Sequence, residues 1–162
     1  MAASIASILR YELPSTHGSI TAMQVRDRIM SVYPSDITYD INGIYNEGRN
    51  PIQARKYLEY YLPSSYSPTY YSTALSMYKV RTIIDGDDPM YLSCGAYNAS
   101  GKRIGGHAVA WYGYKDVPGY QSIYIMNSGT AQLSSASNNS GKFQFSYNNK
   151  TYTWERTVTI DN

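Results

Sequence analysis

The ten residues Gly105–Tyr114 constrain the fold more than any other stretch of the chain. Two glycines are followed by a histidine, His107, and then by an almost unbroken apolar run. An apolar run of this length, bounded by turn residues, is typical of a strand buried on both faces. The two glycines would let another backbone approach closely. We therefore expect a central strand with His107 near its start, where the side chain can be held rigidly and still reach a cleft.

A second strand signal follows at 122–126 and ends in Asn-Ser-Gly-Thr at 127–130. If the two strands pair as an antiparallel hairpin through 115–120, His107 and Asn127 fall at the same end of the ladder. A histidine oriented by an amide is the second half of a Cys-His-Asn triad. Two simpler interpretations stay open, because His107 also fits an inert core histidine and Asn-Ser-Gly is a good turn sequence. Asn127 gains its meaning only from the pairing with His107.

Helical patterns fill the first half of the chain and strand patterns the second. Helices are predicted at 2–12, from Ser19 or Thr21 to about 32, at 51–61 after an Asn50 cap, and near 71–84. Strands are predicted at 90–97, 104–114, 122–126, 142–147 and 151–160, the last two as a hairpin; 15–18, 64–69 and 134–141 are predicted as loops, and 33–50 as turn-rich. This order predicts one α+β domain over 1–162, mainly helical at 1–85 and mainly β at 86–162.

The His and Asn segments, 106–114 and 124–130, resemble the corresponding strands of papain-like cysteine peptidases. The layout is similar to the compact bacterial branch of that family, with staphopain and the bacteriocin-leader-processing peptidases. The resemblance implies a helical half packed on a C-terminal antiparallel sheet or half-barrel, with the site between them. It implies that His107 is the catalytic acid/base and that Asn127 orients it.

The same resemblance places the nucleophile outside this chain. In the family the first helix carries the catalytic Cys at its start, with the oxyanion-hole Gln a few residues earlier. Residues 1–9 resemble the body of that helix, so the Cys would stand just before Met1. Three explanations stay open: the chain begins after the Cys, the Cys lies on a separate piece, or the protein is a non-catalytic relative. As written, the chain is expected to have no thiol peptidase activity.

Two further features bear on this site. Cys94 is the single cysteine, and its predicted strand supplies no helix N-terminus to lower the thiol pKa, so we expect a buried apolar thiol rather than the nucleophile. Members of the family often have a Trp after the Asn-Ser pair that shields the Asn–His hydrogen bond from water. Here Gly129 stands in that place. Trp111 and Trp154 are therefore the candidates for the shield.

Composition excludes several other classes of function. One cysteine and two histidines leave no internal disulfide and predict no metal site and no cofactor. We interpret His17 as an exposed loop histidine without a catalytic role, and the acidic run at 85–88 as a solvated turn rather than a calcium loop. A formal charge of +2 predicts no nucleic-acid partner. No apolar run approaches the ~18 residues of a membrane span.

Taken with the resemblance, these features predict a secreted or extracellular cysteine endopeptidase, although no signal peptide is visible in the chain. Its expected partners are a peptide or protein substrate and a propeptide or inhibitor protein. The alternative is a catalytically inactive papain-like domain that binds peptides or proteins. A third hypothesis, a carbohydrate-binding domain, is supported only by the 19 tyrosines.

Overall fold

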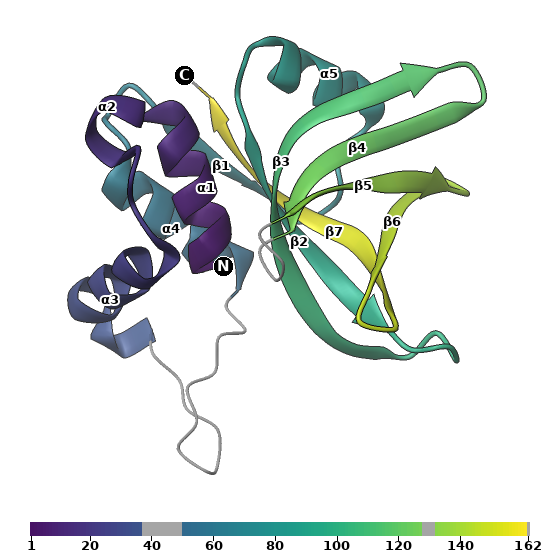
Figure 1. The fold of residues 1–162 in the computed structure, drawn as a ribbon, viewed down its shortest axis with the longest axis horizontal. Coiled ribbons are helices and arrows are strands. Elements are labelled where there is room, and N and C mark those ends of the chain that lie inside the picture. The colour runs from purple at the N-terminus through teal and green to yellow at the C-terminus, as the bar shows by residue number, and fades with distance from the viewer. Residues whose placement is uncertain (37–49, 128–131, 162) are drawn as a thin grey trace.

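A computed structural model describes residues 1–36, 50–127 and 132–161. Helices on one side pack against a large antiparallel sheet on the other, so the domain is mixed α+β (Figure 1). The N-terminus of the first helix points towards the sheet in this view. The helices are α1 (Ala2–Glu12), α2 (Pro14–His17), α3 (Ala22–Val32), the 3₁₀ turn η1 (Pro34–Asp36), α4 (Pro51–Tyr61) and α5 (Met77–Asp85).

Local capping explains where the helices begin. The Thr21 hydroxyl accepts from the backbone N–H of Gln24, and the Gln24 side chain accepts from the backbone N–H of Thr21, forming a capping box at α3. Asn50 caps α4 in the same way, and Pro51 takes the first helical position. The predicted helices at 2–12 and 51–61 are confirmed, and α3 ends at the predicted Val32. By contrast, α1 has Met1 at its N-cap and no side-chain cap.

Seven strands form one antiparallel sheet in the order β1-β7-β2-β3-β4-β5-β6. An additional pairing of β6 with β7 joins the last strand back to the second, so six strands close into a ring while β1 extends the sheet beyond β7. The strands are β1 (Ser67–Tyr71), β2 (Met90–Tyr97), β3 (Arg103–Val117), β4 (Tyr120–Asn127), β5 (Gln132–Asn139), β6 (Lys142–Tyr147) and β7 (Lys150–Asp161).

The two faces of the sheet bury two separate cores. One core fills the ring with side chains such as Leu92, Val109, Trp111 and Ile125, and α5 packs against it. The other core lies between the outer face and the helices, where Ile5 and Leu9 of α1 belong to the same cluster as Ala110 and Val158 of the sheet. These four residues are at most 5% exposed. Since side chains alternate across a strand, β3 contributes to both cores, through Val109 and Trp111 on one face and Ala110 on the other. These three residues are the buried part of β3, so the predicted burial on both faces holds for 109–111 and is wrong for the rest of the apolar run, which is half-buried or exposed.

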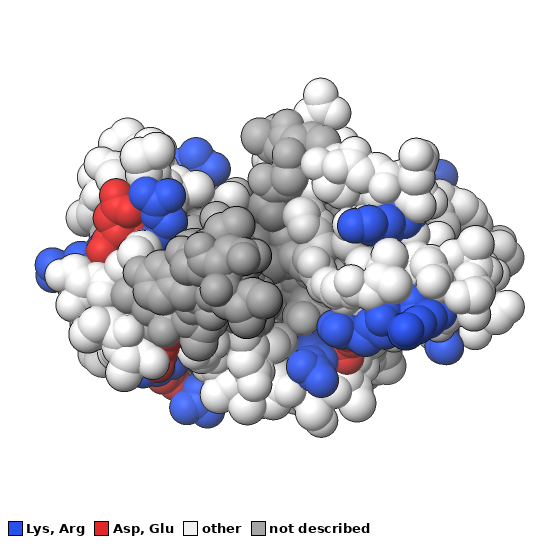
Figure 2. Space-filling view, turned by 90° about the horizontal axis from the view of Figure 1, so that it is seen from below, with Lys and Arg blue, Asp and Glu red and all other residues white. Residues whose placement is uncertain are grey.

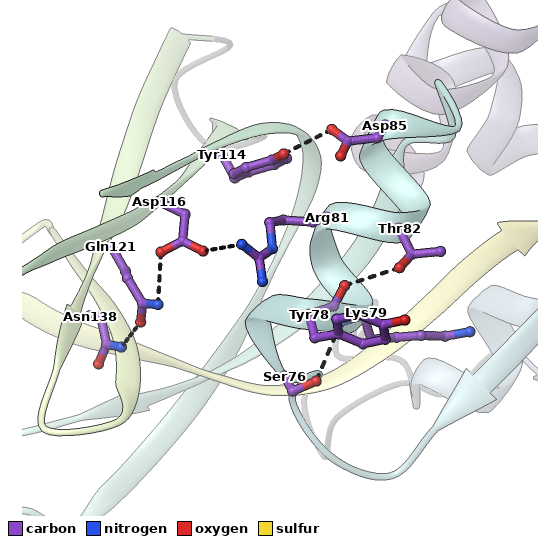
Figure 3. A network of polar contacts seen from close by, with 10 residues as sticks. All are labelled: Ser76, Tyr78, Lys79, Arg81, Thr82, Asp85, Tyr114, Asp116, Gln121 and Asn138. Atoms are coloured by element: carbon purple, nitrogen blue, oxygen red, sulfur yellow. Dashed lines mark hydrogen bonds and ion pairs between the residues drawn. The ribbon is translucent and has the colours of Figure 1, made fainter. Parts of the chain in front are cut away.

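Helix α5 is tied across three strands of the ring by polar contacts (Figure 3). The Tyr114 hydroxyl donates to Asp85 at 2.8 Å, and Arg81 pairs with Asp116 at 3.2 Å. From Asp116 the chain of contacts continues through Gln121 of β4 to Asn138 of β5. Tyr114 and Asp116 lie towards the other end of β3 from His107, roughly 23 and 30 Å along the strand at the usual rise per residue. Helix α5 therefore supports the ring without reaching the histidine.

Two predictions for the first half of the chain are wrong. Residues 15–18 were expected to be a loop, but Pro14 both ends α1 and begins the single-turn helix α2, a position that suits proline because its missing N–H is not needed there. The stretch expected to be a loop at 64–69 and a helix from 71 instead forms β1, and α5 begins only at Met77 behind a Ser76 cap. Strand β1 is stabilised by pairing with residues 157–161, far along the chain.

The expected loop at 134–141 is a third error, since most of it is strand β5. Its side chains are mostly Ser and Asn and largely exposed, so the segment lacks an apolar pattern; Ala136 is the buried exception. Pairing with β4 and β6 satisfies its backbone groups. The strands β2 and β6 have the predicted bounds, and the hairpin turn at Asn148 and Asn149 is confirmed, with φ of 47° and 56°.

Some expectations fall on residues that are not described. Most of the turn-rich stretch at 33–50 and the Ser-Gly-Thr sequence after Asn127 lie outside the described residues. Within the described residues, no helix combines the length and the hydropathy needed to cross a membrane.

Candidate active site

The structure brings His107 and Asn127 together at the same end of the β3–β4 ladder. Asn127 lies opposite Val109, two residues after His107, so all three side chains point to the same face. The Nε2 atom of His107 and the Oδ1 atom of Asn127 are 2.7 Å apart, a good hydrogen-bond distance. Asn127 is 5% exposed, and His107 is half-buried. The amide is thus fixed within the protein while the imidazole keeps access to solvent.

This hydrogen bond sets the tautomer of the neutral imidazole. An amide oxygen only accepts, so Nε2 must carry the proton and Nδ1 the lone pair. Within the described residues, Nδ1 makes no hydrogen bond. The arrangement therefore presents a basic nitrogen that can take a proton from a group placed beside it, with the ring orientation fixed from behind.

Three influences act on the pKa of His107. Burial lowers it below its ordinary value, the hydrogen bond from Nε2 to Asn127 raises it, and the charge of the α-amino group of Met1 lowers it further. The net direction is downward, so the imidazole is neutral at neutral pH. A neutral imidazole is the form that a general base requires.

The start of α1 lies against the sheet at the residues next to His107 and Asn127 in sequence. Helix α1 packs across β3 and β4, and Met1 and Ala2 contact the same apolar cluster as Ala108 and Met126, the residues beside His107 and Asn127 (Figure 1). The N-terminal end of a helix carries a partial positive charge and favours an anion. A thiol placed there would have both the helix and His107 to stabilise its thiolate.

Aromatic side chains of the β6–β7 hairpin surround the imidazole. The ring of Tyr147 stacks on that of His107 with 5.8 Å between centroids and 30° between planes. Tyr152 approaches within 5.3 Å and Phe145 within 6.4 Å, both at 55°. The alternating pattern at 142–147 predicted this hairpin, but it gave no sign that the hairpin faces His107, because that depends on closure of the ring.

The two tryptophans proposed as the shield occupy another place. Trp111 and Trp154 pack edge-to-face on each other with 5.2 Å between centroids, and the indole N–H of Trp154 donates to Thr157 at 3.1 Å. Among the described residues, the rings in contact with His107 are those of Phe145, Tyr147 and Tyr152, not these indoles. Trp111 and Trp154 are therefore not the rings that lie against His107.

Cys94 and His17, the other candidates considered from the sequence, are differently placed. Cys94 is directly opposite His107 in the β2–β3 ladder but is 1% exposed, as expected of an apolar thiol, and burial raises its pKa. His17 was expected to be exposed in a loop; instead it lies on α2, half-buried, with its ring edge-on to Tyr61 at 5.9 Å. Neither residue contributes a reactive group to the His107–Asn127 pair.

The glycines of the β2–β3 ladder differ in how closely a Cβ in their place would approach other atoms. A Cβ at Gly106 would lie 3.3 Å from the carbonyl oxygen of Cys94, whereas one at Gly105 would meet nothing closer than 3.9 Å. The close approach predicted for both glycines thus applies to Gly106. Opposite Gly106, a Cβ at Gly95 would clash with the carboxylate of Glu155 at 2.1 Å.

Glu155 and Arg103 are charged groups beside this glycine pair, Glu155 at Gly95 and Arg103 at Gly106. The Glu155 carboxylate accepts from the Tyr97 hydroxyl at 2.5 Å and pairs with Arg103 at 3.2 Å. These contacts outweigh the effect of burial and lower the pKa of Glu155. In Figure 2, which views the molecule from below, the charged side chains over the sheet are mainly Lys and Arg.

Among the described residues, no group of three His, Cys, Asp or Glu side chains could hold a metal ion. A comparison with known protein families finds no match for the chain, and a comparison with curated protein sequences also finds none.

Proposed function

We propose that the chain is the larger part of a papain-like cysteine peptidase domain, in which His107 is the general acid/base and Asn127 its orienting residue. The observation that carries the proposal is the 2.7 Å contact between Nε2 of His107 and Oδ1 of Asn127, which leaves Nδ1 as the basic nitrogen. A helix that packs on the same two strands, with its start near the imidazole, supports it further. The mixed α+β layout, with helices against an antiparallel sheet, fits such a domain.

In this proposal the nucleophile is a cysteine immediately before Met1. Nδ1 of His107 takes the thiol proton, the thiolate attacks the carbonyl carbon of the scissile peptide bond, and the imidazolium then gives that proton to the leaving amine. Water later attacks the thioester, with His107 again accepting and returning the proton. Asn127 holds the imidazole in the tautomer that both steps require. The expected substrate is a peptide or protein chain.

The second candidate function is a peptide- or protein-binding module without catalysis. The observation that favours it is that the only thiol of this chain, Cys94, is buried and has a raised pKa. In that case the His107–Asn127 pair is a remnant or a hydrogen-bonding element of a binding surface.

The deciding experiment uses the parent polypeptide with the segment upstream of Met1. It is treated with an epoxide inhibitor of thiol peptidases, and the labelled residue is mapped by mass spectrometry. A label on a Cys directly before Met1 supports the peptidase. A label on Cys94 overturns the proposed geometry, and a different residue before Met1 with no label favours the binding module.

A matched pair of variants tests the roles of the two residues. In the thiol-bearing polypeptide, His107→Ala should lower kcat/KM by about 10²–10⁴-fold, the usual contribution of a general acid/base. Asn127→Ala should cost less, because Asn127 orients the ring and transfers no proton. His17→Ala is the control and should keep full activity. Full activity in His107→Ala would contradict the assignment.

A further inference from the structure

The last hairpin of the sheet supplies an aromatic ring to one face of the proposed base. Tyr147 stacks on the imidazole of His107 at 30° between planes, while Tyr152 and Phe145 meet it at a steeper 55°. Tyr152 and Phe145 are themselves stacked, with 5.1 Å between centroids and 15° between planes. They are 6% and 7% exposed and form part of the ring core. Tyr147 is the member of this group that lies at the rim.

The position of Tyr147 is fixed by the backbone rather than by the imidazole. It is the last residue of β6 and pairs with Lys150, the first residue of β7. The two residues between them, Asn148 and Asn149, have the positive φ values of a tight hairpin turn. The turn fixes the backbone of Tyr147, and its ring packs against Tyr152, with 6.3 Å between centroids, and against the ring core. A ring held in this way can act as a stop for rotation of the imidazole.

We propose that Tyr147 is a positioning residue for His107: its ring restricts rotation of the imidazole and keeps water from the face beside the His107–Asn127 hydrogen bond. Asn127 holds one edge of the imidazole, and Tyr147 holds one face. Together they define the direction of Nδ1 more tightly than a single hydrogen bond does, since a hydrogen bond alone leaves the ring free to tilt. The catalytic meaning of this inference rests on the proposed function, but the positioning itself can be measured without catalysis.

The chain allows a direct measurement because it contains only two histidines. NMR titration of a His17→Gln background reports the pKa and the tautomer of His107 alone. The titratable groups around the imidazole are the thiol of Cys94 across the ladder and the phenols of Tyr147 and Tyr152, and the charge of the α-amino group of Met1 also acts on its pKa. All four are present in every variant except for the phenol of Tyr147, so a change can be attributed to that residue.

Tyr147→Ala should raise the pKa of His107 towards the ordinary value of about 6.5 and should broaden or mix its tautomer signals. Tyr147→Phe keeps the ring and should leave both unchanged. The control is Tyr112→Ala, which removes a comparable stacked ring, 6.2 Å from Tyr124 and at 28°, on another part of the sheet. It should leave the pKa of His107 unchanged.

An unchanged pKa and tautomer of His107 in a folded Tyr147→Ala variant would overturn the inference. If that variant fails to fold, Tyr147→Leu replaces it, because leucine keeps apolar cover without a planar ring. A Leu variant that matches the Phe variant would equally overturn the positioning role, and one that differs from it supports the role. Because no peptide is cleaved in these measurements, a failure of the proposed peptidase activity would leave their outcome readable.

Discussion

Cys94 and His107 are direct partners across the β2–β3 ladder, yet only His107 is open to solvent. The thiol is held within the core of the ring, where burial raises its pKa, while the imidazole reaches the rim and meets Asn127. Proximity therefore does not make a catalytic pair here. The neutral thiol lacks both the solvent access and the positive surroundings that a thiolate needs.

The burial of Cys94 predicts that native protein resists thiol reagents. In the folded chain at pH 8, a disulfide reagent such as DTNB should react with Cys94 at least ~100-fold more slowly than in denaturant, since attack needs an exposed thiolate. Release of the coloured product over time measures both rates. Rapid reaction of one thiol in the native protein, without loss of far-UV circular dichroism, would contradict the placement of Cys94.

The lowered pKa of His107 predicts a loss of stability on mild acidification. The unfolded chain binds a proton at this histidine near pH 6.5, whereas the folded chain resists it until a lower pH. Unfolding therefore takes up protons in that window, and the free energy of unfolding falls as the pH drops below about 6.5. Urea denaturation of the native chain and of His107→Gln between pH 7.5 and 5 would measure the effect.

The difference in the free energy of unfolding between the native chain and His107→Gln reports on His107 alone, because carboxyl groups that titrate in the same pH range contribute equally to both. The advantage in stability of the native chain over His107→Gln should shrink as the pH falls. An advantage that grows on acidification would mean that the imidazole is stabilised as its cation, and the proposed direction of the pKa shift would be wrong.

Local signals in the sequence were sufficient for several elements. The pattern of Thr21 with Gln24 and of Asn50 with Pro51 identifies helix starts because the capping groups lie within three residues of each other. The pairing of His107 with Asn127 followed from two strong strand signals joined by a short turn. In each case the interacting residues are near in sequence, so the local pattern carries the information.

The errors arise where no local pattern marks the element. Strand β1 forms by pairing with residues 157–161, and β5 forms between two neighbours although its serines show no apolar alternation. The aromatic cover of His107 depends on β6 meeting β7 and closing the ring, so Tyr147 has no local feature that marks it as part of the site. Such contacts are decided by tertiary pairing, which overrides local preference.

The crowding at Gly95 predicts a sharp difference between two glycine substitutions in this region. Gly95→Ala would place a Cβ against the carboxylate of Glu155 and should cost about 1–3 kcal/mol, the usual cost of overpacking. Gly105→Ala is the matched control, because its Cβ would meet nothing closer than Ala96 at 3.9 Å, and it should change stability by less than about 0.5 kcal/mol. Urea denaturation of both variants measures the difference.

A double-mutant cycle then identifies the clash. Glu155→Ala alone loses the contacts to Tyr97 and Arg103, but in the Gly95→Ala background it also removes the collision with the carboxylate and leaves only the 2.9 Å approach of the Cβ to the Tyr97 ring. The two substitutions together should therefore cost less than the sum of their separate costs, by about 0.5–3 kcal/mol for residues in contact. Strict additivity would show that the carboxylate moves away from Cβ without cost.

The carboxyl group of Glu12 predicts a stabilising substitution. Burial raises its pKa, as do the nearby carboxylates of Asp88 and Asp87, against a hydrogen bond from Tyr66. Its Oε1 atom is buried without a hydrogen-bond partner among the described residues. The raised pKa means that its contribution to stability is fully present below pH ~4.5 and is lost as the pH rises through the folded-state pKa. At neutral pH the charged carboxylate of Glu12 therefore destabilises the folded state.

Glu12→Gln removes that charge and keeps an oxygen for Tyr66, so it should raise the urea midpoint at pH 7. At pH 4 the effect should nearly vanish, because the unchanged chain then carries a largely neutral carboxyl. The control is Glu59→Gln on α4, whose carboxylate is exposed and pairs with Arg55 at 3.1 Å. Removing that exposed pair should lower stability slightly, if at all. A lower midpoint for Glu12→Gln at pH 7 would mean that the Glu12 carboxylate has a compensating partner in solution. The charge of Glu12 would then not destabilise the C-terminal end of α1.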